Sequence, residues 1–174
     1  MNIFATSKDP KIAAFDHCDK HATKMLLETA QLLCTAHHLE GEASDIPNIY
    51  RVTHKNHPSA VWVRSSRANY LWAYDLFVAL CSEFRARFGK VHLTDDKLRT
   101  HLMRVPRNIT DGDLTPPPAC CPEEFHVHAE GEWPTETYKL YLSRGKDWIT
   151  YDSWRRRVGP PAWYGQLVEK SCDI

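Results

Sequence analysis

Two long stretches of the chain repeat apolar residues at the three- and four-residue spacing that places side chains on one face of a helix. The first opens at Pro10, which a first helical turn tolerates, and extends to about Leu39. The second extends from about Ser59 to Phe88 and is followed by a glycine, a typical helix stop. We therefore predict an all-α fold: a single compact domain over residues 1–174, built on two long helices with short helices around them.

Shorter elements surround these two helices. A threonine followed by two aspartates predicts a short helix that is capped by Thr94 and ends before Pro106. Another short helix is expected in "PTETYKLYL", with Thr135 as its cap. Residues 107–134 hold five prolines and show no clear period, so we expect an irregular insertion or lid over 104–134. The apolar start "MNIFATS" is a strand or an extended arm, and the aromatic, basic end of the chain is expected to dock onto the helices.

One line of polar side chains, the polar stripe, runs along the first predicted helix. Its members are spaced alternately four and three residues apart, which places them on one helix face. They are His17, His21, Lys24, Glu28, Gln31, Thr35 and His38. Apolar residues such as Met25, Leu26 and Leu32 lie on both sides. This pattern indicates a helix that floors a cleft, where burial shifts pKa values. The alternative is a partly exposed helix with a narrow hydrated seam.

Glu28 is the most informative member of the polar stripe. A single carboxylate among apolar neighbours is either the ion-pair partner of Lys24, one turn before it, or a catalytic acid or base. Histidines could also supply a metal site, because two of them share a helix face at ligand spacing and two lie in a later loop. The candidate ligands are His17, His21, His54 and His57. The chain lacks a His-Glu-x-x-His pattern, so we expect no metal.

The stretch "THKNHP", residues 53–58, concentrates hydrogen-bond donors. Such side chains bind phosphates and base edges. The candidates for substrate contact are His54, Lys55, Asn56 and His57. The alternative is an ordered loop whose Asn and His cap the following helix. Arg64 and Asn69 extend the polar surface, and the aromatic residues between and beyond them suit either nucleic acid or the protein core.

Composition and charge limit the class of protein. With 174 residues, 43% of them hydrophobic and 25% charged, the chain suits one globular domain. It has no apolar run of membrane-spanning length and no signal-peptide pattern, so we expect a cytoplasmic protein whose six cysteines are reduced. The formal net charge is zero, but residues 51–107 hold 11 Lys and Arg against 4 Asp and Glu. This basic middle third either faces an anionic partner or serves solubility.

Three patches of the sequence resemble the phage pyrimidine dimer DNA glycosylases of the endonuclease V type. "CDKH" and "ATKMLLE" are similar to that family's first helix, in which an Asp-x-His precedes the catalytic Glu by the interval that separates His21 from Glu28. The segment "HPSAVWVRSSRANYLWAYDLFVALCSEFRARFGK" resembles its second long helix, and "PPAWYG" resembles its C-terminal Pro-x-Trp-Tyr. The chain is thus similar to that family or to a divergent phage relative of it.

The resemblance implies a DNA glycosylase whose N-terminal α-amine attacks the deoxyribose C1′ and forms a Schiff base, with or without an abasic-site lyase step. By position Met1 supplies the amine and Glu28 the carboxylate, with His21 beside them. The substrate contacts expected from the stripe, the loop and the C-terminal aromatics are Lys24, Gln31, His54, Lys55, Asn56, His57, Arg64, Asn69, Trp163 and Tyr164.

Further expectations follow from the same resemblance. The partner would be double-stranded DNA carrying a damaged or modified pyrimidine, and the protein would be a monomer without a cofactor in the cytoplasm of a phage's host cell. Two other classes of function stay open. One is a phage enzyme that modifies nucleotides or DNA bases, or a histidine-based metal-dependent hydrolase. The other is a non-catalytic, nucleic-acid-binding phage accessory protein.

Overall fold

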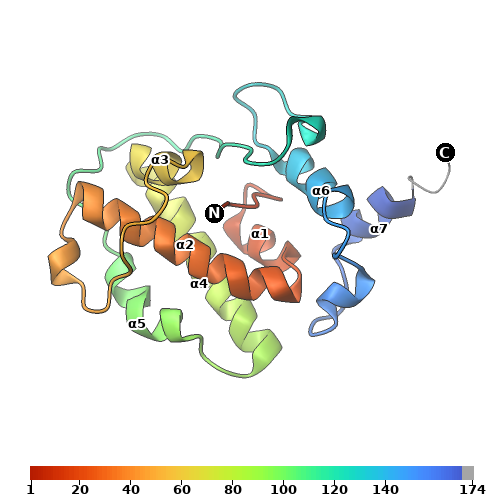
Figure 1. Cartoon of the computed structure of the whole chain (residues 1–174), viewed down its shortest axis with the longest axis horizontal. Coiled ribbons are helices and arrows are strands. Elements are labelled where there is room, and N and C mark those ends of the chain that lie inside the picture. The colour runs from red at the N-terminus through yellow and green to blue at the C-terminus, as the bar shows by residue number, and fades with distance from the viewer. Residues whose placement is uncertain (170–174) are drawn as a thin grey trace.

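The computed structural model describes residues 1–169, and every regular element in that part of the chain is helical, as predicted. Figure 1 shows α2 crossing the front of the molecule with α4 behind it, and α6 and α7 at one end. The elements are α1 (Pro10–Asp16), α2 (Asp19–Glu40), η1 (Ala43–Asp45), α3 (Pro58–Ser65), α4 (Arg67–Phe88), α5 (Leu93–Leu102), η2 (Glu123–Phe125), α6 (Thr135–Arg144), η3 (Tyr151–Trp154) and α7 (Ala162–Glu169).

The core lies between α2 and α4, the two long helices. Leu26 and Leu33 of α2 and Tyr70 and Phe77 of α4 are fully buried there. Helix α1 packs on α4, and α3 and α5 pack against both α2 and α4. Burying large apolar side chains of this kind contributes roughly 1.5–3 kcal/mol each. The apolar faces that the sequence predicts therefore pack the two longest helices against each other. One edge of α2 is left for contacts with other parts of the chain.

The prediction of one continuous first helix was wrong, because the chain leaves helical geometry at His17 and Cys18. The side chain of Arg87, from α4, donates to the backbone carbonyls of His17 at 2.6 Å and Phe15 at 3.2 Å. These carbonyls lie at the C-terminus of α1, where the last carbonyls of any helix have no intrahelical N–H from which to accept a hydrogen bond. His17 therefore precedes α2 and is not a member of its face, so the polar stripe begins at His21.

The second long helix is also divided, at Ser66. Ser66 is extended, and its hydroxyl accepts from the N–H of Asn69 and donates to the carbonyl of Asp113. The N–H of Arg67 donates to the carbonyl of Thr110 at 2.9 Å. The irregular segment that contains Thr110 and Asp113 thus supplies the hydrogen-bond partners that a continuous helix would supply itself. The prediction of one helix from Ser59 to Phe88 was wrong at this residue, whereas the stop at Gly89, which has a φ of 67°, was confirmed.

Two predicted caps were misplaced by one or two residues. Helix α5 is capped by His92, whose ring nitrogen accepts from the N–H of Thr94, so Thr94 lies inside the helix. Helix α6 begins at Thr135 itself, after Pro134. Both errors come from assigning the cap to the nearest hydroxyl residue, which sequence preference favours.

The N-terminal segment is an extended arm and not a strand. Ile3, Phe4 and Ala5 are buried against the helices, so the arm is an integral part of the core.

Residues 104–134 are irregular apart from the short turn η2, as predicted. None of them lines the cavity described below, and they support the N-terminal arm from outside, so the expected lid is not seen.

The aromatic end of the chain docks onto the junction between α1 and α2, as predicted. The indole N–H of Trp154 donates to the carbonyl of Asp16 at 3.1 Å, and that of Trp163 donates to the Asp16 carboxylate at 3.0 Å. Burial raises the pKa of Asp16, and the hydrogen bond from Trp163 opposes that change. The docking brings the segment between α6 and η3 alongside the start of α2.

Cys18, Cys34 and Cys81 are buried on the apolar faces of their segments, as predicted. Burial raises the pKa of Cys34 to about 11, so its thiol is protonated at neutral pH. Cys120 and Cys121 are partly buried and free, and Cys172 lies outside the described residues. No helix in the part of the chain that the structure describes is long and apolar enough to cross a membrane.

Candidate active site

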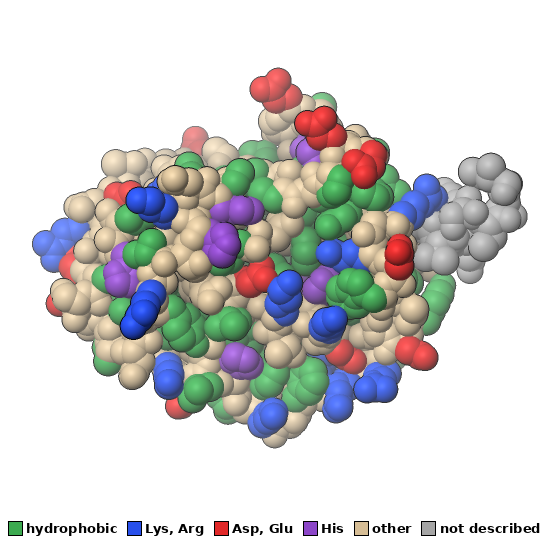
Figure 2. Space-filling model, viewed as in Figure 1, with side chains coloured by type: hydrophobic (Ala, Val, Ile, Leu, Met, Phe, Trp, Pro, Cys, Tyr) green, Lys and Arg blue, Asp and Glu red, His purple; other side chains and the backbone are tan. Residues whose placement is uncertain are grey.

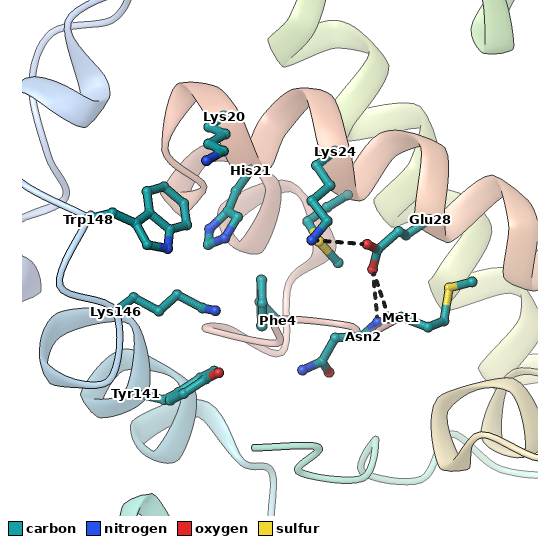
Figure 3. A pocket seen from close by; sticks show the side chains of 11 residues that line it. Met1, Asn2, Phe4, Lys20, His21, Lys24, Glu28, Tyr141, Lys146 and Trp148 are labelled. Atoms are coloured by element: carbon teal, nitrogen blue, oxygen red, sulfur yellow. Dashed lines mark hydrogen bonds and ion pairs between the residues drawn. The ribbon is translucent and has the colours of Figure 1, made fainter. Parts of the chain in front are cut away.

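A cavity of about 290 Å³, the N-terminal cavity, lies over the first half of α2. Figure 3 shows α2 along one side, the N-terminal arm beneath it, and side chains from the end of α6 and the segment after it on the other side. The lining residues are Met1, Asn2, Phe4, Lys20, His21, Lys24, Met25, Glu28, Tyr141, Lys146 and Trp148. The cavity therefore joins three parts of the chain that are far apart in the sequence.

Glu28 binds three nitrogen atoms. Its Oε2 lies 3.5 Å from the α-amine of Met1 and accepts from the N–H of Asn2 at 3.1 Å. Its Oε1 lies 3.5 Å from the Nζ of Lys24, so the predicted helical ion pair is present. The Glu28 side chain is only 14% exposed, whereas that of Lys24 is 63% exposed. Glu28 thus pairs with Lys24 and also holds the N-terminal amine in the cavity, and its role as a catalytic acid or base stays a prediction.

Asn2 fixes the position of the amine. Its side-chain amide donates to the carbonyl of Cys120 at 2.8 Å, and its Oδ1 accepts from the hydroxyl of Tyr138 at 2.8 Å. The Tyr138 hydroxyl also accepts from the N–H of Cys120 at 2.9 Å, and the ring is fully buried. These hydrogen bonds tie the N-terminal end of the chain to the buried Tyr138 and keep the amine beside Glu28.

His21 lies at the opposite end of the cavity from Met1, between the rings of Phe4 and Trp148, with centroid distances of 4.9 and 5.0 Å. Burial, with smaller contributions from His17 and the nearby lysines, lowers the pKa of His21 to about 2. Its Nδ1 is buried and has no hydrogen-bond partner within residues 1–169. His21 is therefore neutral at physiological pH, and its part in catalysis stays a prediction.

The cavity is cationic although the chain is neutral. Lys20, Lys24 and Lys146 line it together with the α-amine, and Glu28 is the one carboxylate in the lining. The Nζ of Lys20 lies 4.5 Å from the centre of the Trp148 ring, and that of Lys146 lies 4.7 Å from the Tyr141 ring. Figure 2 shows basic side chains and histidines around an acidic group in the middle of this face, whereas acidic side chains gather on the loop at the top.

The second half of the polar stripe does not reach the cavity. The Thr35 hydroxyl accepts from the N–H of Thr53 and donates to its carbonyl, both at 3.2 Å. The ring of His38 bonds the carbonyl of Tyr50 at 3.0 Å. Gln31 is partly exposed and is not part of the cavity wall, so the structure does not support its predicted substrate contact.

The loop "THKNHP" lies beside the Met1 end of the cavity without lining it. His57 caps α3 by accepting from the N–H of Ser59 at 3.2 Å, as the structural alternative predicted. Burial lowers the pKa of His57, and the positive charge of the α-amine lowers it further, which places the two groups within electrostatic range. His54, Lys55 and Asn56 are exposed. Substrate contact by this loop stays a prediction.

Arg64 and Asn69 have structural partners. Arg64 donates to the carbonyl of Lys55 and lies 3.8 Å from Glu40. Asn69 is completely buried, and both polar atoms of its amide bond to neighbours that include Thr115. Asn69 is therefore unavailable to a substrate, and this prediction was wrong.

The lysines of the cavity come from residues 20–24 and 146, outside the basic middle third, so whether that third faces an anionic partner or serves solubility stays open. Several arginines of the middle third are instead paired within the fold. Arg87 pairs with Glu83 at 2.7 Å and Arg99 with Asp95 at 2.5 Å.

Trp163 and Tyr164 do not lie in the cavity. Tyr164 is 3% exposed, and its hydroxyl donates to the carbonyl of Ile149 at 2.6 Å. The indole N–H of Trp163 binds Asp16. The predicted stacking of Tyr164 on a displaced base was wrong because the ring is in the core. These two residues instead position the segment that carries Lys146 and Trp148.

Sequence reasoning missed several residues of the cavity. Lys20 was detectable, since it precedes Lys24 by one helical turn. Tyr141, Lys146 and Trp148 gave no local signal, because only the docking of the C-terminal part brings them to α2. Residues 1–169 hold no group of three or more His, Cys, Asp or Glu side chains that could bind a metal ion. In comparisons with known proteins, no family model, curated protein or solved structure matches the chain.

Proposed function

We propose that the protein is a DNA glycosylase that cleaves the N-glycosidic bond of a damaged or modified pyrimidine. The observation that carries the proposal is the position of the Met1 α-amine, 3.5 Å from Glu28 inside a cavity whose other charged groups are lysines. An amine can attack C1′ of deoxyribose, and a fixed carboxylate stabilises positive charge on the sugar. The sequence resemblance assigns the same two roles to the same two residues.

The proposed reaction uses the α-amine in its neutral form. Its nitrogen bonds to C1′ as the bond from C1′ to the base breaks, and the base leaves with the electron pair and takes up a proton. Glu28 accepts the proton that the attacking amine loses and returns it to the ring oxygen as the sugar opens. The product is a Schiff base between Met1 and C1′. Water releases the sugar from it, or β-elimination first breaks the bond to the 3′ phosphate.

Borohydride trapping tests this proposal. The protein is mixed with duplexes that carry a thymine dimer, an abasic site or ordinary bases, and the mixture is reduced. The proposal predicts a covalent adduct with the dimer or the abasic strand. Acetylation of the α-amine should abolish the adduct, because an amide nitrogen forms no Schiff base. A folded protein that gives no adduct with any strand contradicts the amine mechanism and favours a monofunctional glycosylase or a nucleotide-modifying enzyme.

A matched pair of variants separates chemistry from general charge effects. Glu28→Gln removes the carboxylate that faces the amine. Glu136→Gln removes a carboxylate from an exposed pair with Lys139, outside the cavity, and should react like the wild type. Equal adduct yields from both variants would contradict the role given to Glu28.

A further inference from the structure

A second cavity, the outer cavity, adjoins the N-terminal cavity and has a volume of about 580 Å³. Lys20, Lys24 and Trp148 line both cavities, so these side chains form a shared wall. The remaining wall of the outer cavity comes from the start of α2, from Phe88 at the end of α4, and from η3 with the two arginines that follow it. Nothing in the glycosylase proposal accounts for this second space.

The outer cavity combines aromatic rings with cations. Trp148 is 43% exposed, and the Nζ of Lys20 lies over its ring. On the far side, the guanidinium of Arg156 lies 5.0 Å from the centre of the Phe88 ring. Aromatic faces next to basic groups are the combination that binds unstacked nucleotides, in which the rings contact bases and the cations contact phosphates. The walls thus fit a nucleotide better than an apolar partner.

The charge of the outer cavity points to the same class of ligand. Lys20, Lys24, Arg155 and Arg156 face two carboxylates, those of Asp19 and Asp152. Asp19 is already engaged, since it lies 3.4 Å from Arg87 and accepts from the N–H of Arg156 at 3.0 Å. Arg155 makes no ion pair within residues 1–169. Lys24 pairs with Glu28, but the lining still carries more positive groups than carboxylates.

We propose that the outer cavity binds the nucleotide next to the target nucleotide on the same DNA strand. The phosphate that links the two nucleotides then lies at the shared wall, beside Lys20 and Lys24, and Trp148 separates the two bases. This inference rests on the glycosylase proposal for the N-terminal cavity. It identifies the substrate as a strand: a free nucleotide would fill the first cavity and leave Arg155 and Arg156 without an anion.

The length dependence of binding tests the proposal. The full chain is titrated with 5′-phosphorylated thymidine mono-, di- and trinucleotides at fixed ionic strength, followed by calorimetry. We expect the trinucleotide to bind about tenfold more tightly than the mononucleotide, which is the scale of one added stacking contact. In the double variant Arg155→Ser/Arg156→Ser this gain should disappear, while the mononucleotide affinity stays within about twofold of the wild type because the first cavity is intact.

A second double variant controls for charge. Lys8→Ser/Lys11→Ser removes two exposed cations that line neither cavity, and it should keep the gain with length. Trp148→Leu should reduce the gain without unfolding the protein, since the ring is half exposed. Equal affinity for all three lengths, or a full gain in the Arg155→Ser/Arg156→Ser protein, would overturn the proposal.

Failure of this inference is distinguishable from failure of the proposed function. Adduct formation without a gain in affinity with length contradicts the outer cavity alone. The opposite result is a gain in affinity with length that the Arg155→Ser/Arg156→Ser protein lacks, together with no adduct in the borohydride experiment. It contradicts the glycosylase chemistry and supports the outer cavity as a strand-binding subsite.

Discussion

The two halves of the polar stripe on α2 have the same residue spacing and different fates. In the first half, Lys24 and Glu28 face a cavity, and His21 is buried beside it with an unpartnered Nδ1. In the second half, Thr35 and His38 bond the backbone of residues 50–53, and Thr35 is buried whereas His38 stays exposed. Polar groups that a helix buries must find partners. Backbone groups supply those partners in the second half, whereas in the first half Glu28 pairs with Lys24 and the Met1 amine at the cavity.

This difference explains why the pattern alone did not decide between a cleft and a structural seam. The first half borders a cavity, as the cleft interpretation predicted; in the second half Thr35 is buried, so the alternative of a hydrated seam fits the exposed His38 but not Thr35. The deciding factor is what covers each half. Residues 50–53, in the loop that follows α2, contact the second half, whereas the N-terminal arm and the docked C-terminal part line a cavity over the first half. The following changes separate the halves.

Glu28→Gln should have the largest effect on the first half. The amide keeps the volume of the carboxylate but removes the charge beside the α-amine, so we expect adduct formation to slow by about 10²–10⁴-fold. Trapping rates measure this effect, and circular dichroism on the same sample monitors the fold. A variant that is unfolded would instead identify Glu28 as a structural residue.

Tyr138→Phe should loosen the chain end without touching the cavity lining. It removes the hydroxyl that holds Asn2 and leaves buried polar groups unpaired, at a cost of about 1–3 kcal/mol. Displacement of the amine by a fraction of an ångström should also slow trapping by about tenfold or more. Thermal melting and trapping are measured on one sample. Wild-type trapping by the variant would mean that Asn2 does not position the amine.

His21 should give the first half a pH-dependent stability. Its folded pKa of about 2 lies below the usual 6.5, so below pH 6.5 the unfolded chain takes up a proton that the folded protein does not. Stability then falls with decreasing pH, by at most about 1.4 kcal/mol per unit for this residue. His21→Leu should flatten the dependence of urea midpoints on pH between 6.5 and 5.

Other groups contribute to the same pH profile and are unchanged in that variant. The pKa values of His17 and His37, lowered by burial to about 4, act in the same direction, and the raised pKa of Asp16 acts in the opposite one. His38→Leu removes an exposed histidine of the second half as the matched control. A slope that is identical in wild type and His21→Leu would contradict the buried, neutral state of His21.

Thr35→Val should affect the second half alone. The substitution keeps the shape of the side chain and leaves both the N–H and the carbonyl of Thr53 without their hydroxyl partner. We expect a loss of about 1–2 kcal/mol in the free energy of unfolding, with trapping rates at the wild-type level. Slower trapping at full stability would show that the two halves are coupled.

Much of the fold could be predicted because apolar periodicity is local. The core helices followed from it, but the breaks at His17 and Ser66 did not, since their causes are Arg87 and the carbonyl of Asp113, both distant in the sequence. The prolines that usually mark such breaks are absent at both positions.

The residues of the candidate site likewise fall into those that the sequence identified and those that only the fold brings together. Lys24 and Glu28 were identified from helical spacing, and Met1 from the resemblance. Lys146 and Trp148 reach the cavity only through the docking of the C-terminal part, for which no spacing rule exists. Conversely, Asn69 and Tyr164 have side chains of the types that bind nucleotides, but their polar groups are engaged in hydrogen bonds within the protein.

The most direct test of the account is to locate the nitrogen that carries the trapped sugar. After borohydride reduction with an abasic strand, the protein is digested and the modified peptide is identified by mass spectrometry. The account predicts the modification on the α-amine of Met1, next to Glu28. Modification of Lys24 or Lys146, or of surface lysines without preference, would contradict it, because the amine held by Glu28 would then not be the nucleophile.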